Sequence, residues 1–142
     1  MGIRNDHQKQ DRRAKRASKT ASEPPDDRWK PPPAAECDPD KVEKYALSGT
    51  SRIVVRTTHY QGRLVDYAVM HEIQEGGAWA VAARIDCCHG EVHHHTIDLE
   101  TRETDKRKVL RPLYQEKDVS DSFDDSYAAI LSVAEMGAWS NE

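Results

Sequence analysis

The sequence predicts an α+β fold: a four- or five-stranded antiparallel meander with a C-terminal helix packed on one face, preceded by a disordered basic tail. Three observations support this prediction. From residue 51 to residue 100, apolar and polar residues alternate with the period of two that is typical of strands. Two-residue breaks that contain glycine interrupt the alternation, as in hairpins. Near the C-terminus, apolar residues recur at helical spacing.

Residues 1–36 are predicted to be the tail, and residues 37–142 a single α+β domain. The first 33 residues have a net charge of +4 and the remaining 109 have a net charge of −8, so a basic tail precedes an acidic domain. We expect Arg12, Arg13, Lys15 and Arg16 to contact nucleic acid, with a purely solubilising tail as the alternative. Trp29 is a candidate to dock on the domain or on a partner.

Four strands are predicted within the domain, over residues 51–59, 63–73, 78–88 and 91–100. The turns between them lie at residues 61–62, 76–77 and 89–90, and each contains glycine. If the sheet has five strands rather than four, residues 106–114 form the fifth.

Two helices flank these strands. Residues 38–47 are predicted to form a short helix, because Asp38 suits its N-cap and Pro39 suits its first position. Residues 120–136 are predicted to form the C-terminal helix, with Ser120 or Asp121 as the cap. Its apolar stripe, which we expect to cover one face of the sheet, consists of Phe123, Tyr127, Ile130, Leu131 and Ala134.

The composition indicates a cytoplasmic protein with no membrane partner. The three cysteines, Cys37, Cys87 and Cys88, are too few for a secreted disulfide framework. The N-terminus lacks the apolar stretch of a signal peptide, and no apolar run approaches the length of a membrane span.

Four of the seven histidines lie within residues 89–95. If each turn has two residues, the hairpins fix which side chains are neighbours across the strands. Arg84 and His95 then share one face of the sheet, whereas His94 points to the other face. The adjacent row on the face of His95 consists of Arg56, Tyr67, Asp86 and His93.

One interpretation of this cluster is a divalent-metal site. His93 and His95 lie two residues apart on a strand, and His89 or Asp86 can supply a third ligand of the kind that zinc accepts. The neighbouring arginines oppose a cation. We therefore expect no metal cofactor, with zinc on His89, His93 and His95 as the alternative.

A second interpretation is an acid–base site. Asp86 would orient His93 and raise its pKa, and the arginines would hold a phosphate group. Two histidines in this setting can activate a 2′-hydroxyl and protonate the leaving oxygen without a metal. The candidate catalytic residues are His93, His95, Asp86, Arg84, Arg56 and Tyr67. A third interpretation is a solvated sheet face, on which such cross-strand pairs add only modest stability.

The stretch from Asp86 to His95 resembles a D-x-x-H-G-x-x-H-x-H block in a group of small uncharacterised bacterial and phage proteins. It is more distantly similar to the TumE-type putative toxins of toxin–antitoxin pairs. The residues that fill the block are Asp86, His89, Gly90, His93 and His95. The resemblance implies a small toxin-like α+β domain with RNA as its target and an antitoxin as its partner.

These observations lead to one expected function and one competing class. We expect a toxin-like protein that cleaves RNA phosphodiesters without a metal, as a ribonuclease-like hydrolase or transferase. The alternative is a non-catalytic binding module, either an antitoxin or a phage protein that binds a host protein or nucleic acid.

Overall fold

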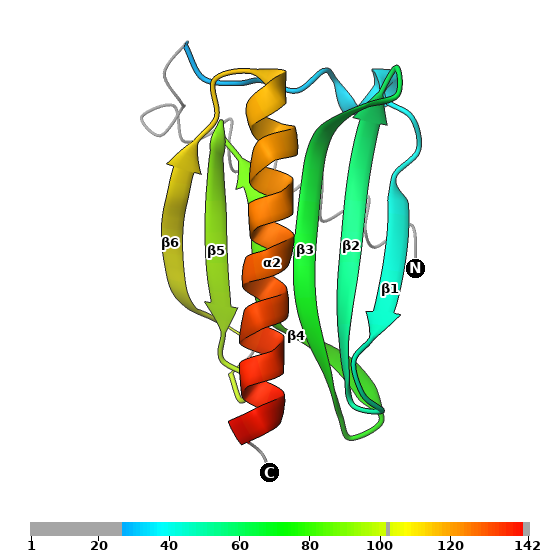
Figure 1. Cartoon of the computed structure of the whole chain (residues 1–142), viewed down its shortest axis with the longest axis vertical. Coiled ribbons are helices and arrows are strands. Elements are labelled where there is room, and N and C mark those ends of the chain that lie inside the picture. The colour runs from blue at the N-terminus through cyan, green and yellow to red at the C-terminus, as the bar shows by residue number, and fades with distance from the viewer. Residues whose placement is uncertain (1–26, 102, 141–142) are drawn as a thin grey trace.

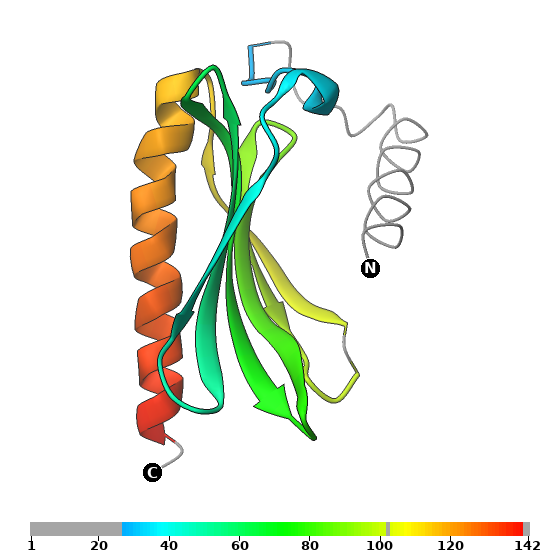
Figure 2. The same cartoon turned by 90° about the vertical axis from the view of Figure 1, so that its right-hand side faces the viewer.

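The computed structural model describes residues 27–101 and 103–140. In these residues, six strands form one antiparallel sheet in sequence order, and a long helix lies along one face (Figure 1 and Figure 2). The strands are β1 (Lys41–Ala46), β2 (Ser51–Tyr60), β3 (Arg63–Glu75), β4 (Ala78–Cys88), β5 (Glu91–Ile97) and β6 (Thr104–Pro112). The helices are the short 3₁₀ helix η2 (Ala34–Glu36) and α2 (Glu116–Ser140). The α+β class and the antiparallel meander are confirmed, with six strands rather than four or five.

The additional strand, β1, replaces the predicted helix over residues 38–47. All six residues of β1 are exposed, and the strand pairs with β2 from Lys41 opposite Thr57 to Ala46 opposite Arg52. The local signals at Asp38 and Pro39 are compatible with a helix. Pairing along β2 supplies the backbone hydrogen bonds instead, because tertiary context overrides a weak local propensity.

The hydrophobic core lies between α2 and the sheet. α2 packs mainly on β3, with fewer contacts to β2 and β4. The predicted apolar stripe is confirmed, since Ile130 and Ala134 are buried in the core while Phe123, Tyr127 and Leu131 pack against it. The sheet contributes Ile53, Val55, Tyr67, Val69, Ala83, Ile85 and Val92 to the same core.

The helix α2 begins at Glu116 rather than near Ser120, so the predicted caps are wrong. Asp118, in the first turn, accepts hydrogen bonds from the backbone N–H groups of Tyr114 and Gln115. A carboxylate in this position satisfies donors that have no partner within the helix and suits the positive end of the helix dipole. Within the described residues, no helix is both long and apolar enough to span a membrane.

Two irregularities of pairing set which residues share a face. Beside each turn, β2 pairs with β3 and β3 pairs with β4 as two-residue hairpins require. The register then shifts by one residue between Thr58 and His59, and again between His71 and Glu72. Such bulges insert an extra residue into one strand. Beyond them, every predicted neighbour pair across β2, β3 and β4 is displaced by one position.

Two residues of the predicted tail contact the sheet. The backbone N–H of Trp29 donates to the carbonyl of Leu113, and its indole packs against the core and donates to the carbonyl of Val65. The Arg28 guanidinium donates to the carbonyl of Gly90 and lies 3.5 Å from the Glu91 carboxylate. We call residues 28 and 29 the clasp. The tail residues predicted to contact nucleic acid, Arg12, Arg13, Lys15 and Arg16, lie outside the described residues.

Candidate functional site

The hairpin between β4 and β5 holds the histidine cluster in the predicted register. Its turn residues, His89 and Gly90, have φ values of 54° and 71°, as expected for the two-residue turn that suits a twisted hairpin. The pairs Asp86–His93, Ile85–His94 and Arg84–His95 are all present.

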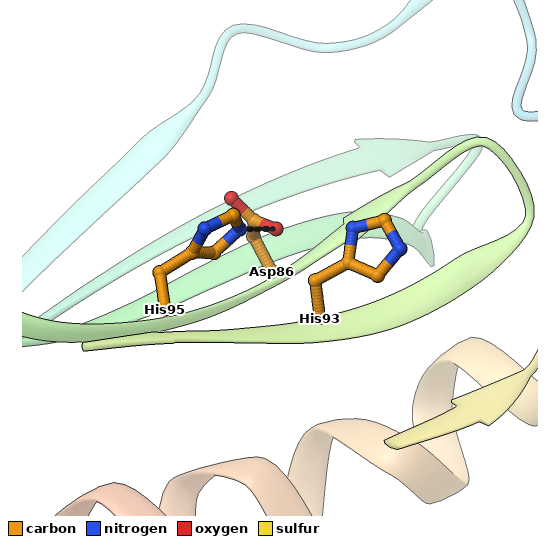
Figure 3. Close-up of side chains that lie close together, drawn as sticks. All are labelled: Asp86, His93 and His95. Atoms are coloured by element: carbon orange, nitrogen blue, oxygen red, sulfur yellow. Dashed lines mark ion pairs between the residues drawn. The ribbon is translucent and has the colours of Figure 1, made fainter. Parts of the chain in front are cut away.

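His93 and His95 share one face of the sheet with Asp86 and Arg84. We call this the far face, because it lies opposite α2 (Figure 3). His94 points to the side of α2, as its alternation along the strand requires. The prediction that His93 and His95, but not His94, share a face with Arg84 is therefore confirmed.

Tyr67 does not belong to this site. The bulge in the β3–β4 pair places Ala68 opposite Asp86, so Tyr67 projects from the face that α2 covers. Its side chain is 0% exposed, and its hydroxyl lies 2.9 Å from the hydroxyls of both Ser122 and Ser126 on α2. Burial raises the pKa of Tyr67. The structure therefore does not place Tyr67 beside Asp86 and His93 as predicted, and its hydroxyl anchors the helix to the sheet instead.

We expect Tyr67→Phe to lower the free energy of unfolding by about 1–3 kcal/mol, because the two serine hydroxyls each lose a buried partner. The RNA cleavage that the sequence leads us to expect should stay within about twofold of wild type in the folded variant, because the ring lies on the opposite face from His93 and His95. Urea unfolding and a cleavage assay check the two expectations. A hundredfold loss of cleavage in a folded variant would contradict the structural role.

Arg56 lies on the far face but not at the histidines. It pairs with Ala68 on β3, and β5 is three strand positions from β2, or about 14 Å at the usual spacing. Its guanidinium instead binds two carboxylates, Asp66 at 3.4 Å and Asp40 at 3.5 Å. The structure therefore does not bring Arg56 together with His93 as predicted.

Asp86 contacts His95 rather than the predicted His93. Its Oδ1 lies 3.5 Å from His95 Nε2 (Figure 3). Its Oδ2 lies 2.9 Å from Arg84 Nε. In a twisted sheet a side chain readily reaches its diagonal neighbour instead of the residue directly opposite. Burial alone would raise the pKa of Asp86, but His95 and the Arg84 charge lower it below its ordinary value. Asp86 is therefore ionised and holds His95.

His93 is enclosed between two charged side chains, and only 3% of its side chain is exposed. Arg107 donates to Nδ1 across 3.0 Å, and Glu91 Oε2 lies 3.5 Å from Nε2. A guanidinium has no lone pair to share, so Nδ1 is the acceptor and the ring proton sits on Nε2. Burial and then the Arg107 charge lower the pKa of His93. The expected rise in this pKa is therefore wrong in direction.

Arg107 and Glu91 are the site residues that the sequence argument missed. Arg107 lies opposite His95 in the β5–β6 pair, so it reaches the far face directly beside the histidines. No sequence signal fixes this pairing, because β5 ends at Ile97 and β6 begins at Thr104, so the connection is longer than a two-residue turn, and the register shifts between Val92 and His93 and between Thr96 and Ile97. Glu91 precedes His93 by two residues. Side chains two residues apart on a strand point to the same face, so the sequence alone could have placed Glu91 beside His93.

Three side chains on the far face have the spacing of a metal-ligand set. One ligand atom each from Asp86, His93 and His95 lies within 4.8 Å of the others. Among the described residues, His89 is not part of this set; it occupies the turn at positive φ. The third candidate ligand is therefore Asp86. The ring centroids of His93 and His95 are 6.1 Å apart, with their planes at 81°.

The chain matches a family model described as Domain of unknown function (DUF7718), over residues 38–131. The matched stretch runs from before β1 into α2 and includes the whole sheet and the cluster on its far face. Among curated proteins and among solved structures, none matches the chain.

Proposed function

The chain belongs to the family described as Domain of unknown function (DUF7718), and we propose that it cleaves RNA without a metal through His93 and His95. The observation that carries this proposal is the pair of imidazoles on the far face, 6.1 Å apart and each held by a charged neighbour. Two positioned imidazoles flanking one phosphodiester are what a coupled proton transfer requires.

The two histidines suit different halves of the reaction. His93 is neutral, and its Nδ1 can take the proton of the 2′-hydroxyl once Arg107 turns from it to the substrate phosphate. His95, beside the Asp86 carboxylate, can deliver a proton to the leaving 5′-oxygen. The 2′-oxygen then bonds to phosphorus as the P–O5′ bond breaks, which gives a 2′,3′-cyclic phosphate and a 5′-hydroxyl. Arg84 and Arg107 would stabilise the added negative charge on the phosphoryl oxygens.

The toxin-like role and the antitoxin partner rest on the resemblance of the block from Asp86 to His95 to the TumE-type putative toxins. A toxin that cleaves the RNA of its own cell would need a partner that restrains it. A host protein is the other candidate partner. Induction of the chain in bacteria should arrest growth, and co-expression of a small neighbouring gene product should relieve the arrest.

The direct test is incubation of purified, tag-free protein with total RNA in excess EDTA. We expect cleavage that leaves 2′,3′-cyclic phosphate ends. Matched DNA and 2′-O-methyl RNA should remain intact, because neither carries the 2′-hydroxyl that attacks phosphorus. Intact RNA at high protein concentration would sink the proposal.

Removal of residues 1–26 separates an enzyme from a binding module. The cut ends before the clasp, so the contacts of Arg28 and Trp29 with the sheet are kept. An enzyme with its site on the far face should keep its kcat on a short RNA, and the loss of basic residues should raise KM and weaken its dependence on salt. A module that binds through its tail would lose its partner altogether. Cleavage kinetics at two salt concentrations measure the difference.

A further inference from the structure

Asp86 and His95 approach each other at a distance that suits a shared ion better than a hydrogen bond. Asp86 Oδ1 and His95 Nε2 are 3.5 Å apart, and Oδ1 is buried with no hydrogen-bond partner among the described residues. Ligands at about 2.0–2.1 Å from a tetrahedral zinc ion lie about 3.3 Å from each other. The pair therefore has nearly the separation of two zinc ligands.

The third ligand is available on the same face. A nitrogen of His93 lies within 4.8 Å of the ligand atoms of Asp86 and His95. A shift of at most about 1.5 Å in the imidazole would bring it to ligand distance. Arg84 occupies Oδ2 of Asp86 and leaves Oδ1 free to coordinate. Two imidazoles and one carboxylate, with a fourth position open to water, form a set that zinc accepts.

We propose that Asp86, His93 and His95 capture a zinc ion and that zinc is a reversible inhibitor of the acid–base site. Capture of the ion stands on the geometry alone, whereas inhibition rests on the proposed function. The two states exclude each other because they use the same two imidazoles, and a ring nitrogen bound to zinc can neither accept nor carry a proton. A histidine that coordinates zinc can neither take the proton of the 2′-hydroxyl nor deliver one to the leaving oxygen.

Arg107 sets how readily the ion binds. Its guanidinium contacts His93 Nδ1 at 3.0 Å, so its charge opposes a cation at this position. The side chain is exposed and can move into solvent. Arg107→Gln should therefore tighten zinc binding by roughly tenfold or more, because it removes a like charge a few ångströms from the ion. The same change should weaken RNA cleavage, because it removes a group that holds the phosphate.

Titration of the tag-free full chain with zinc, followed by calorimetry, tests capture without any RNA. We expect one ion per chain, and cobalt at the same stoichiometry should give the visible absorption of a four-coordinate site. His95→Ala and Asp86→Asn should weaken binding by more than about tenfold, comparable with losses seen when the surroundings of a metal site are altered. His94→Ala is the matched control, since this histidine lies on the other face, and it should bind as wild type does.

Several outcomes decide between the proposals. The metal site is overturned if wild type binds neither ion, if His94→Ala loses the ion as His95→Ala does, or if Arg107→Gln binds it more weakly. Cleavage that continues at saturating zinc overturns inhibition. A chain that binds one zinc and leaves RNA intact supports the site while contradicting the proposed function.

Discussion

His93→Ala and His95→Ala are each expected to lower the rate of RNA cleavage by about a hundredfold or more. Groups that transfer protons in a transition state typically contribute 10²–10⁴-fold. Each substitution removes one of the two imidazoles that flank the proposed phosphodiester. The cleavage rate of the double variant should be little lower than that of the less active single variant, because the effects of residues that act as a unit are not additive. Single-turnover rates on a short RNA in EDTA measure these effects.

His94→Ala is the control that the strand itself supplies. It removes an imidazole from the position between His93 and His95 in the strand. That imidazole points to the face that α2 covers, away from the proposed site. It should cleave RNA at close to the wild-type rate. Equal losses of cleavage rate in all three histidine variants, at matched unfolding midpoints, would mean that the cluster is structural.

Asp86→Asn should lose less cleavage activity than either His93→Ala or His95→Ala. It removes a carboxylate that positions His95 and leaves both imidazoles in place.

The register of the β4–β5 hairpin could be predicted because a single local feature determines it. The two residues of the turn, His89 and Gly90, fix every pair along both strands, and no bulge interrupts them before His95. The strand alternation then separates His93 and His95 from His94. Tyr67 lies on the face opposite to the one predicted, because the bulge between His71 and Glu72 leaves no clear mark in one sequence.

The side-chain partners were harder to predict than the faces. Asp86 lies opposite His93 as predicted, yet its carboxylate reaches diagonally to His95. Which histidine the carboxylate contacts depends on the twist of the sheet and on Arg84, whose guanidinium forms an ion pair with Oδ2. Similarly, residues 38–47 carry adequate helix signals, but the competing partner is β2, which lies next in the chain and offers an unpaired edge. Local patterns do not rank such alternatives.

Gly90→Ala is expected to destabilise the protein by about 2–5 kcal/mol, more than the same change at another turn glycine. Gly90 has a φ of 71°, a conformation in which a non-glycine residue is less stable by about 1–2 kcal/mol. An added Cβ would also lie 2.5 Å from the Cβ of Arg28 and 3.3 Å from the carbonyl oxygen of Trp29. Overpacking of this kind typically costs about 1–3 kcal/mol more. Urea unfolding measures the total.

Gly62→Ala separates the two contributions. Gly62 has a φ of 79°, and an added Cβ would have nothing within 4 Å, so only backbone strain remains. The difference between the two variants therefore reports the contact of the clasp with the β4–β5 turn. Arg28→Gly removes the opposing Cβ, and in a double-mutant cycle it should recover about 1–2 kcal/mol of the stability lost in Gly90→Ala. An additive cycle would mean that the clasp does not press on the turn. Because Arg28 also holds Glu91, which faces His93, loss of the clasp should disturb the imidazole that the proposed reaction needs.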